Sequence, residues 1–247
     1  MTIHNFITNI KWQFDPLHWK SSFRLKRLQN MHRGQRCFII GNGPSLNKMD
    51  LSPLKDEITF GLNRIYLLFP KWGFSTTYYV AVNNLVIKQF GYDIEKLDMI
   101  KFISWYSRQW INFTDDMIFI RDPYDGTMQF SKDPTNKIWE GATVTYVAMQ
   151  LAYYLGFKQV ILIGVDHNFS TKGEPHKEII SDGPDKDHFS SNYFNEGIRW
   201  QLPDLEMSEN AYSLAKDYYF NDNREILDAT IDGKLKIFPK IKFSEIF

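Results

Sequence analysis

Short apolar runs that end in glycine or a polar residue recur along the first two thirds of the chain. Such runs are typical of strands buried on both faces of a parallel sheet. The candidate strands are Cys37–Ile40, Ile58–Gly61, Thr77–Val82, Ile100–Trp105, Met117–Ile120 and Val160–Ile163. Gly141–Leu155 instead has apolar residues at helical spacing and is followed by Gly156, a common helix terminator. The alternation predicts an α/β protein with a Rossmann-like, mostly parallel, doubly wound sheet.

The C-terminal third changes character. A tract at about residues 167–203 is rich in glycine, proline and histidine and has little periodicity, which favours a long lid inserted into the domain. Ser208 is expected to cap a helix that ends near Phe220. Two strands, Ile226–Ala229 and Leu235–Phe238, are expected to follow, joined by a turn at Asp232-Gly233.

Residues 1–33 form a separate pattern, an amphipathic helical arm broken at Pro16. Asp15 is its one acidic residue, and aromatic and aliphatic residues alternate with basic ones. The basic residues are Lys11, Lys20, Arg24, Lys26, Arg27 and Arg33. Three interpretations stay open: packing on its own domain, packing on another subunit of a homo-oligomer, or docking on an anionic membrane surface. Residues 34–247 are expected to form one nucleotide-binding catalytic domain.

Composition narrows the class of protein. The 247 residues are 43% hydrophobic and 16% aromatic, enough for one large core. The formal net charge of zero argues against duplex nucleic acid as a partner. Cys37 is the single cysteine, so no intrachain disulfide can form. The absence of a long apolar run or a signal-peptide core predicts a cytoplasmic location, free or at the inner face of a membrane.

The first candidate strand ends in a glycine-rich turn, Gly41-Asn42-Gly43-Pro44-Ser45. Glycines let a backbone approach a ligand closely. Ser45 is expected to cap a following helix, whose N-terminal amides attract phosphate. Neither the dinucleotide-binding glycine pattern nor a Walker lysine follows, so the turn predicts an anion or nucleotide site of another kind.

Polar residues also follow the other candidate strands. They are Asn63 and Arg64 after the second strand, Asn83 after the third, and Gly164, Asp166 and His167 after the last; Lys137, Gly141 and Thr143 precede the long helix. Carboxyl ends of parallel strands share one rim, where ligands of open α/β sheets bind. Amides, hydroxyls and cations on that rim suit a base, a ribose and a phosphate.

The lid carries the candidate base, His188. Histidine titrates near neutrality and can take a proton from a hydroxyl nucleophile. Asp187 is the expected orienting carboxylate, with His167 as the competing base. Asp185-Lys186-Asp187 also matches the metal-holding Asp-x-Asp of many sugar transferases, but one such triplet is expected by chance, so no metal site is assigned.

Several of these segments resemble a bacterial and archaeal superfamily. It includes the motility-associated-factor flagellin glycosyltransferases, the archaeal hydroxymethylpterin diphosphokinases and, more remotely, the family 42 sialyltransferases. The resemblance spans roughly residues 34–240, and within it the chain looks most like uncharacterised proteins encoded with surface-polysaccharide genes. The segments that carry it are Cys37–Leu46, Gly141–Val144, Leu155–Phe157 and Ile161–Asp166.

The resemblance implies a nucleotide bound at the carboxyl rim. The sialyltransferases use CMP-sialic acid without a metal, and their lid histidine acts as general base, which His188 matches by order. Their cytidine-monophosphate contacts match Asn42, Ser45, Asn63, Gly164 and Asp166. The chain departs from them at Lys137, where they have arginine, and at Glu140, where they have serine. Their lid tyrosines, which support the leaving phosphate, have no counterpart in Asp166–Lys177.

The resulting hypothesis is a glycosyltransferase of surface glycan biosynthesis that needs no cofactor. It would move a sugar from a nucleotide-activated donor, such as a CMP-linked nonulosonate, to a glycan or glycoconjugate. His188 would deprotonate the acceptor, while Arg64 and Lys137 would stabilise the departing phosphate.

Two alternatives remain. One is an ATP-dependent diphosphokinase of the hydroxymethylpterin type, with Mg²⁺ on Asp166, Asp185 and Asp187. The other is a non-catalytic nucleotide-binding subunit.

Overall fold

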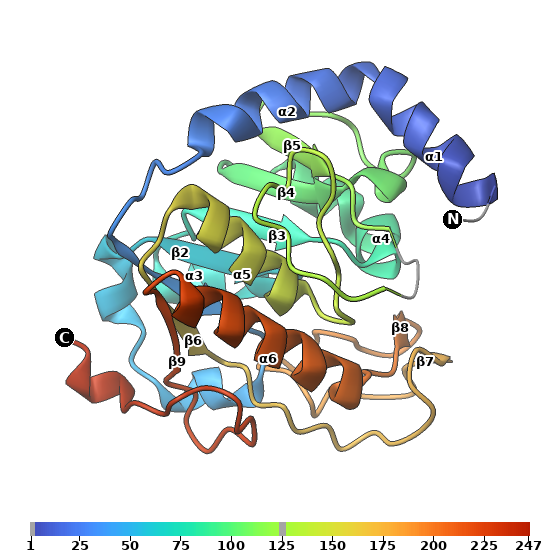
Figure 1. Ribbon diagram of the computed structural model, residues 1–247. Helices are drawn as coiled ribbons and strands as arrows, with labels where there is room; N and C mark the ends of the chain where they lie inside the picture. The colour runs from blue at the N-terminus through green and yellow to red at the C-terminus, as the bar shows by residue number, and fades with distance from the viewer. Residues whose placement is uncertain (1–2, 124–126) are drawn as a thin grey trace.

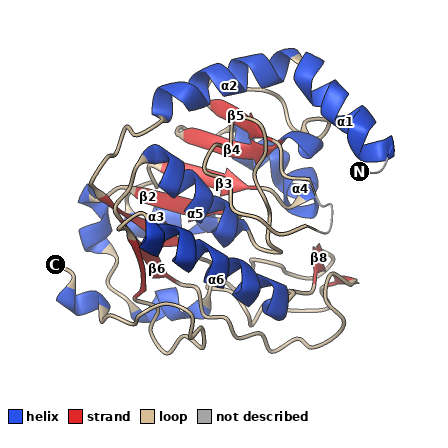
Figure 2. Ribbon diagram, viewed as in Figure 1, coloured by secondary structure: helices blue, strands red, loops and turns tan. Residues whose placement is uncertain are grey.

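Within residues 3–123 and 127–247, which the computed structural model describes, seven strands form one central parallel sheet (Figures 1 and 2). The strands are β1 (Arg36–Ile40), β2 (Thr59–Leu62), β3 (Tyr78–Ala81), β4 (Ile100–Ser104), β5 (Met117–Ile120), β6 (Gln159–Ile163) and β9 (Glu225–Asp228). All neighbouring pairs are parallel. The predicted Rossmann-like sheet is therefore confirmed.

The strands read as continuous apolar runs because both faces of the sheet are covered. Cys37 and Ile39 point into one hydrophobic core, together with helices α5 (Val144–Leu155) and α6 (Leu205–Asn221). Phe38 and Ile40 point into a second core on the opposite face, with helix α4 (Asn84–Glu95) and several 3₁₀ turns. Successive residues of one strand thus serve two cores, as expected for a doubly wound sheet.

The strand order places a topological switch beside β1. The order is β5-β4-β3-β2-β1-β6-β9, so the chain builds outward from β1 to β5 and then crosses back to β6. α5 makes this return crossover and packs against β1, β2 and β3. In open α/β sheets, ligands bind where the strand order reverses, outside the carboxyl ends of the strands. Here that position lies between the ends of β1 and β6.

The N-terminal arm consists of helices α1 (Ile3–Phe14) and α2 (Pro16–Leu28), which curve over the β5 side of the molecule (Figure 1). They are separated at Pro16, as predicted, and the Asp15 side chain caps α2 by accepting from the Leu17 amide at 2.8 Å. A short helix, α3 (Phe69–Trp72), follows the second strand. The described helices are all too short or too polar to traverse a bilayer.

Three local predictions are wrong. Leu235–Phe238 is not a strand: Leu235 and Phe238 are apolar because they pack in the core beside β9, without pairing to it. Helix α6 is capped by Asp204, whose carboxylate accepts from the Met207 amide, while Ser208 lies inside the first turn. The turn after β1 leads into a 3₁₀ helix, Pro44–Lys48, rather than an α-helix, so it offers no helix dipole for phosphate.

The lid contains a two-stranded antiparallel ribbon, β7 (Glu178–Ile180) and β8 (Arg199–Gln201), which the sequence did not predict. Its edge is tied to α4 by Gln89. The Gln89 Nε2 donates to the carbonyl of Arg199 at 2.8 Å, and its Oε1 accepts from the amide of Arg199 at 3.0 Å. The lid is thereby held across the carboxyl rim of the sheet.

Candidate functional site

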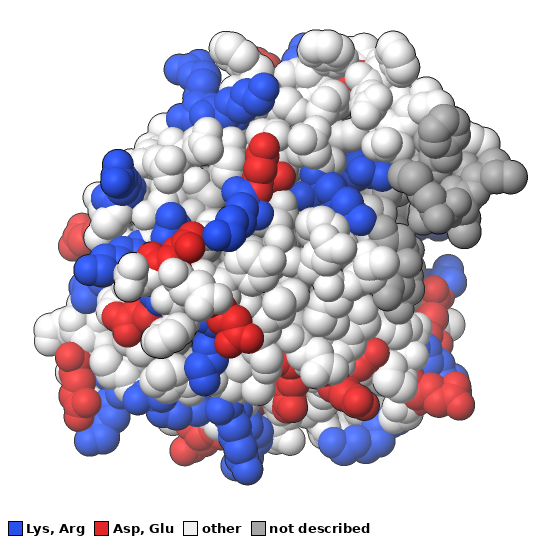
Figure 3. All heavy atoms as spheres, in the orientation of Figure 1, with Lys and Arg blue, Asp and Glu red and all other residues white. Residues whose placement is uncertain are grey.

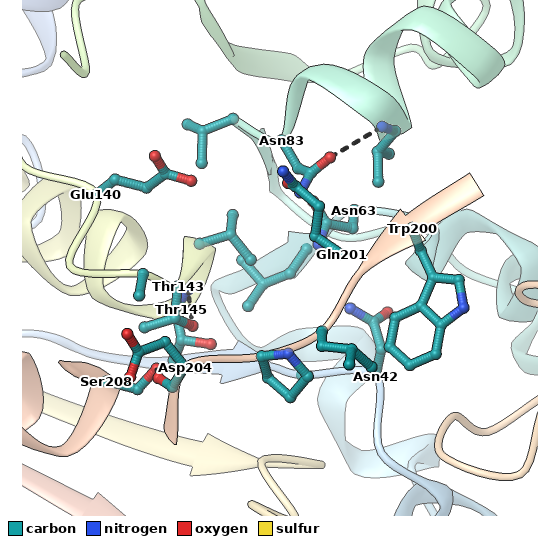
Figure 4. Close-up of a pocket in the computed structure, with 18 of the residues that line it drawn as sticks. Asn42, Asn63, Asn83, Glu140, Thr143, Thr145, Trp200, Gln201, Asp204 and Ser208 are labelled. Carbon is teal, nitrogen blue, oxygen red and sulfur yellow. Dashed lines mark hydrogen bonds between the residues drawn. The ribbon is translucent and has the colours of Figure 1, made fainter. Parts of the chain in front are cut away.

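A cavity of about 760 Å³ opens at the switch between β1 and β6 (Figure 4). Its walls come from the ends of β1, β2, β3 and β6, the start of α5, and the lid. The sequence-predicted residues that line it are Asn42, Gly43, Asn63, Asn83, Thr143, Gly164, Asp166, His167 and His188. These side chains, distant in sequence, meet at one mouth because parallel strands deliver their carboxyl ends to the same rim.

The turns after β1 and β6 interlock at the floor of the cavity. The Gly43 amide donates to the carbonyl of Gly164 at 2.9 Å, and a Cβ on Gly43 would lie 1.8 Å from Asp166 Oδ2. Asp166 accepts from the Ser45 amide at 3.1 Å and from its hydroxyl at 2.6 Å. Ser45 therefore holds Asp166 instead of capping a helix. Burial raises the pKa of the Asp166 carboxyl, an effect that the Ser45 hydrogen bonds oppose.

Two rim asparagines have unsatisfied acceptors. Within the described part of the chain, the buried Oδ1 atoms of Asn42 and Asn63 have no hydrogen-bond partner. Asn83 is different, because its Oδ1 caps α4 by accepting from the Leu85 amide at 2.9 Å. Figure 4 shows all three amides around the same opening. A buried polar atom without a partner is costly, so a ligand that donates hydrogen bonds here would gain affinity.

The start of α5 forms another wall. Gly141 (φ 55°) and Ala142 (φ 58°) make a left-handed turn that delivers Thr143 to the N-cap position. Its hydroxyl accepts from the Thr145 amide at 3.3 Å, and both threonines line the cavity. The positive end of the α5 dipole thus faces the space where an anion would lie. Gly141 serves the turn and does not itself line the cavity.

His188 forms a buried dyad with Asp185. Its Nδ1 lies 2.8 Å from Asp185 Oδ2, and its ring stacks on Tyr193 with centroids 4.0 Å apart. A carboxylate at Nδ1 favours the tautomer in which Nε2 carries the free lone pair. The amide of Phe189 donates to the carbonyl of Asn42 at 2.9 Å, which fixes the histidine beside the first turn.

The carboxylate that orients His188 is therefore Asp185. The sequence analysis expected Asp187, which is wrong. Asp187 instead accepts from the amide and hydroxyl of Thr171 and from the amide of Ser170, so it ties two parts of the lid together. The i, i+3 spacing of Asp185 and His188 was the signal available in the sequence. The turn that starts at Asp185 brings its carboxylate to the His188 ring, whereas Asp187, although adjacent in sequence, bonds Ser170 and Thr171.

The two cations expected at the phosphate do not line the cavity. Arg64 is buried behind it, donates from its guanidinium to the carbonyls of Asn192 and Tyr193, and lies 3.7 Å from the centre of the Phe90 ring. It supports the ring on which His188 stacks. Lys137 lies over the ring of Trp139, with Nζ 4.4 Å from its centre. Pro44 and Ser45 also lie behind the cavity wall, among the described residues that do not line it.

A pair of acidic side chains, Asp122 and Glu140, lines the cavity on the α5 side. Asp122 is 5% exposed and accepts from the Ser104 hydroxyl at 2.7 Å. Burial raises the pKa of Asp122 well above its ordinary value, with a contribution from Glu140. Burial likewise raises the pKa of Glu140 to about 7. Both carboxyls therefore lose their protons at a higher pH than an exposed carboxyl does.

The other ionisable groups at the cavity are paired. His167 Nε2 lies 2.8 Å from Glu209 Oε1, and His176 Nε2 lies 3.3 Å from Asp204 Oδ2. Asp166, Asp185 and Asp187, the carboxylates considered for Mg²⁺, have different hydrogen-bond partners. In residues 3–123 and 127–247, no group of three or more histidine, cysteine or acidic side chains is arranged to hold a metal ion.

Two residues of the lid line the cavity although the sequence analysis did not predict them. Trp200 and Gln201 of β8 face the cavity beside Asn42 and Asn83, as Figure 4 shows. Trp200 stacks on Phe194 with centroids 5.5 Å apart. The Asn83 amide nitrogen lies 3.4 Å from Gln201 Oε1 and so connects rim and lid. No periodicity marked these residues, because the ribbon is too short to alternate visibly.

Comparison with known proteins gives one decisive match. The family model described as 6-hydroxymethylpterin diphosphokinase MptE-like matches residues 5–172, which is more than half of the chain. The chain belongs to this family. The match covers the arm and the sheet as far as β6 and the start of the lid, including the turns that interlock at the cavity floor. A sequence search of curated proteins finds no match.

One solved structure shows likeness of fold. A motility-associated-factor glycosyltransferase from Magnetospirillum magneticum AMB-1 aligns over 94% of this chain with 14% identity and a TM-score of 0.52. This chain spans 39% of the length of that protein. A mammalian sialyltransferase aligns over 95% of this chain and 87% of its own, with 10% identity and a TM-score of 0.42.

Proposed function

We propose that the protein transfers a group from a nucleotide-activated donor to a hydroxyl of an acceptor, with a nucleotide sugar as the donor. The observation that carries the proposal is the Asp185–His188 dyad, set against a rim of amide side chains in one cavity. This combination would supply a base, polar groups for a nucleotide and a helix N-terminus for phosphate. Family membership and the fold shared with a glycosyltransferase support the same class of chemistry.

In the proposed reaction, His188 Nε2 takes the proton of the acceptor hydroxyl. The acceptor oxygen then bonds to the anomeric carbon of the donor sugar, and the bond from that carbon to the nucleotide phosphate oxygen breaks, with its electrons leaving on the phosphate. Asp185 stabilises the imidazolium that forms, because it is a carboxylate at hydrogen-bond distance from Nδ1. A positioned base of this kind contributes about 10²–10⁴-fold.

The departing phosphate is assigned to the N-terminus of α5. Thr143, Val144 and Thr145 line the cavity there, so the departing phosphate would lie at the positive end of the α5 dipole. Asn42 and Asn63 offer unpaired amide oxygens to N–H or O–H donors of the base or ribose. Arg64 and Lys137 are not part of this proposal, because other groups of the protein engage them.

The second candidate is diphosphate transfer from ATP to a hydroxymethyl group. Two observations favour it: the activity after which the matched family is described, and the acidic pair Asp122 and Glu140 in the cavity wall. Mg²⁺ is commonly held by one or two carboxylates together with substrate phosphates, and this pair would supply such oxygens. The metal would neutralise charge on the transferred diphosphate.

A thermal-shift screen separates the two candidates. CMP, CDP, UDP, GDP and ATP are each added to the full chain with and without Mg²⁺. A ligand at 100 times its dissociation constant stabilises the fold by about 2.7 kcal/mol, which raises Tm by several degrees. We expect a cytidine or other sugar-carrier nucleotide to raise Tm without Mg²⁺. A shift by ATP alone that requires Mg²⁺ would favour diphosphate transfer.

The Asn42→Ala variant tests whether the nucleotide binds in this cavity. It removes an unpaired cavity amide, so the nucleotide-induced shift should shrink, whereas Asn221→Ala, at the exposed end of α6, should keep it. If no nucleotide raises Tm, or if Asn42→Ala shifts as the wild type does, the proposed nucleotide site is wrong.

A further inference from the structure

The inner face of the N-terminal arm is explained by packing on its own domain. Leu25 and Leu28 of α2 are buried in the sheet core, and Trp12 of α1 packs edge-on to Trp105 with centroids 5.4 Å apart. Ser21 Oγ accepts from the Phe119 amide at 2.9 Å, and Arg24 donates to the carbonyl of Met117 at 3.0 Å. α2 thereby covers β5, an edge strand whose free backbone groups would otherwise be exposed.

The outer face of the arm has no such explanation. Six of the ten large hydrophobic side chains that are exposed in the described part of the chain lie between residues 7 and 31. The most exposed are Phe14 at 78%, Trp19 at 68% and Phe23 at 66%. Trp19 and Phe23 are four residues apart on α2 and share one side of the helix. Clustering of this kind marks an interaction surface, whereas scattered exposed residues do not.

The charges on this outer face all have one sign. Lys11, Lys20, Lys26 and Arg27 are exposed around the aromatic side chains. The arm's one carboxylate, Asp15, is turned inward, where it accepts from Trp105 Nε1 at 2.8 Å and pairs with Arg108. One acid, Asp115, lies at the flank and pairs with Arg24. Figure 3 shows basic side chains gathered over the C-terminal part of α2, next to uncharged surface.

We infer that the outer face of α1 and α2 docks on an anionic lipid surface. The aromatic side chains would enter the interface between headgroups and acyl chains, while the lysines and arginines would contact lipid phosphates. Exposed aromatic side chains flanked by lysines and arginines are complementary to this partner. A second copy of the same basic face would repel it, because like charges would meet.

Docking would also orient the cavity. Thr8 of α1 lines the cavity, so the helix that carries part of the docking face also forms a wall of the site. The cavity would then open next to the membrane, where an amphiphilic acceptor can reach it. This orientation rests on the proposed function, whereas the docking itself does not, because lipid binding requires no nucleotide.

The test measures co-sedimentation of the full chain with phosphatidylcholine vesicles, with and without phosphatidylglycerol. We expect binding to the anionic vesicles only, and weaker binding as salt is raised. Trp19→Ser combined with Phe23→Ser should lower the partition coefficient at least about tenfold, because two aromatic side chains no longer enter the interface. Phe220→Ser is the matched control, since Phe220 is 78% exposed on α6, away from the arm.

Each outcome decides the inference. The inference is overturned if the wild-type protein does not bind anionic vesicles, or if the double variant binds them as well as the wild type does. A wild-type dimer in sedimentation equilibrium that the double variant converts to a monomer, without vesicle binding by either, assigns the face to a second copy instead. Thermal unfolding checks that the variants fold, which is expected because both aromatic side chains are exposed.

Discussion

At the scale of single residues, the Asp185–His188 dyad can be tested directly by substitution. His188→Ala removes the base, so turnover with the donor found in the nucleotide screen should fall by at least about two decades, with nucleotide affinity nearly unchanged. Asp185→Asn should also lower turnover, because Asp185 holds the histidine tautomer.

The lid itself provides the control for this prediction. Asp187→Asn changes a neighbouring carboxylate that contacts Ser170 and Thr171 and not His188. Its effect on turnover should be the smaller one. Equal turnover in His188→Ala and wild type would remove the base assignment, and a larger effect of Asp187→Asn than of Asp185→Asn would reverse the roles of the two aspartates.

Glu140 gives the protein a pH-dependent stability. Burial raises its pKa from 4.5 to about 7 in the folded state, so the folded protein keeps a proton that the unfolded chain releases. Stability is therefore unaffected by Glu140 below pH ~4.5, falls as pH rises toward 7, and stays lowered above it. At 1.36 kcal/mol per pKa unit, the full loss is roughly 3 kcal/mol.

Urea unfolding between pH 4.5 and 8 measures this effect. Glu140→Gln cannot ionise, so its midpoint should fall less than that of the wild type over the range. Glu196→Gln, a change at an exposed lid position, should follow the wild-type curve. Parallel curves for Glu140→Gln and wild type would show that Glu140 ionises in the folded protein as it does in the unfolded chain.

At the scale of elements, the lid depends on the hydrogen bonds between Gln89 of α4 and Arg199 of β8, here called the clasp. Gln89→Ala removes two hydrogen bonds to the backbone of Arg199. At about 1 kcal/mol each, their loss should speed amide hydrogen exchange in β8 roughly tenfold or more, without lowering global stability comparably. Gln13→Ala, an exposed glutamine of α1, is the matched control. Unchanged exchange in residues 199–201 would show that the clasp does not hold the ribbon.

At the scale of the whole molecule, the position of the site follows from strand order. β1 lies between β2 and β6, so the turns after Ile40 and Ile163 become neighbours although they are far apart in sequence. Their hydrogen bonds create the cavity floor, and the crossover helix α5 points its N-terminus at it. Loops vary in such a fold while the rim stays in place, so the same fold can serve different transfer reactions.

Much of this could be predicted from the chain. Buried parallel strands must be apolar throughout, so six of the seven sheet strands were visible as runs, and the polar residues that follow them identified the rim. β9 was expected as one of a pair, but its supposed partner is apolar for core packing alone. Helix α4 was not predicted. The predicted caps at Ser45 and Ser208 are wrong, because the Ser45 hydroxyl donates to Asp166 and the Ser208 hydroxyl donates to the carbonyl of Asp204.

What the chain determined by itself was local: where backbone turns sharply, which side chains need burial, and which polar groups end each strand. Only the tertiary structure decided the pairings. Asp185 rather than Asp187 contacts His188, Arg64 donates to a carbonyl of the lid, and Glu140 contributes to the raised pKa of Asp122. These outcomes depend on contacts between segments that fold together from distant positions, and a side chain's hydrogen bonds and pKa are set by what surrounds it in space.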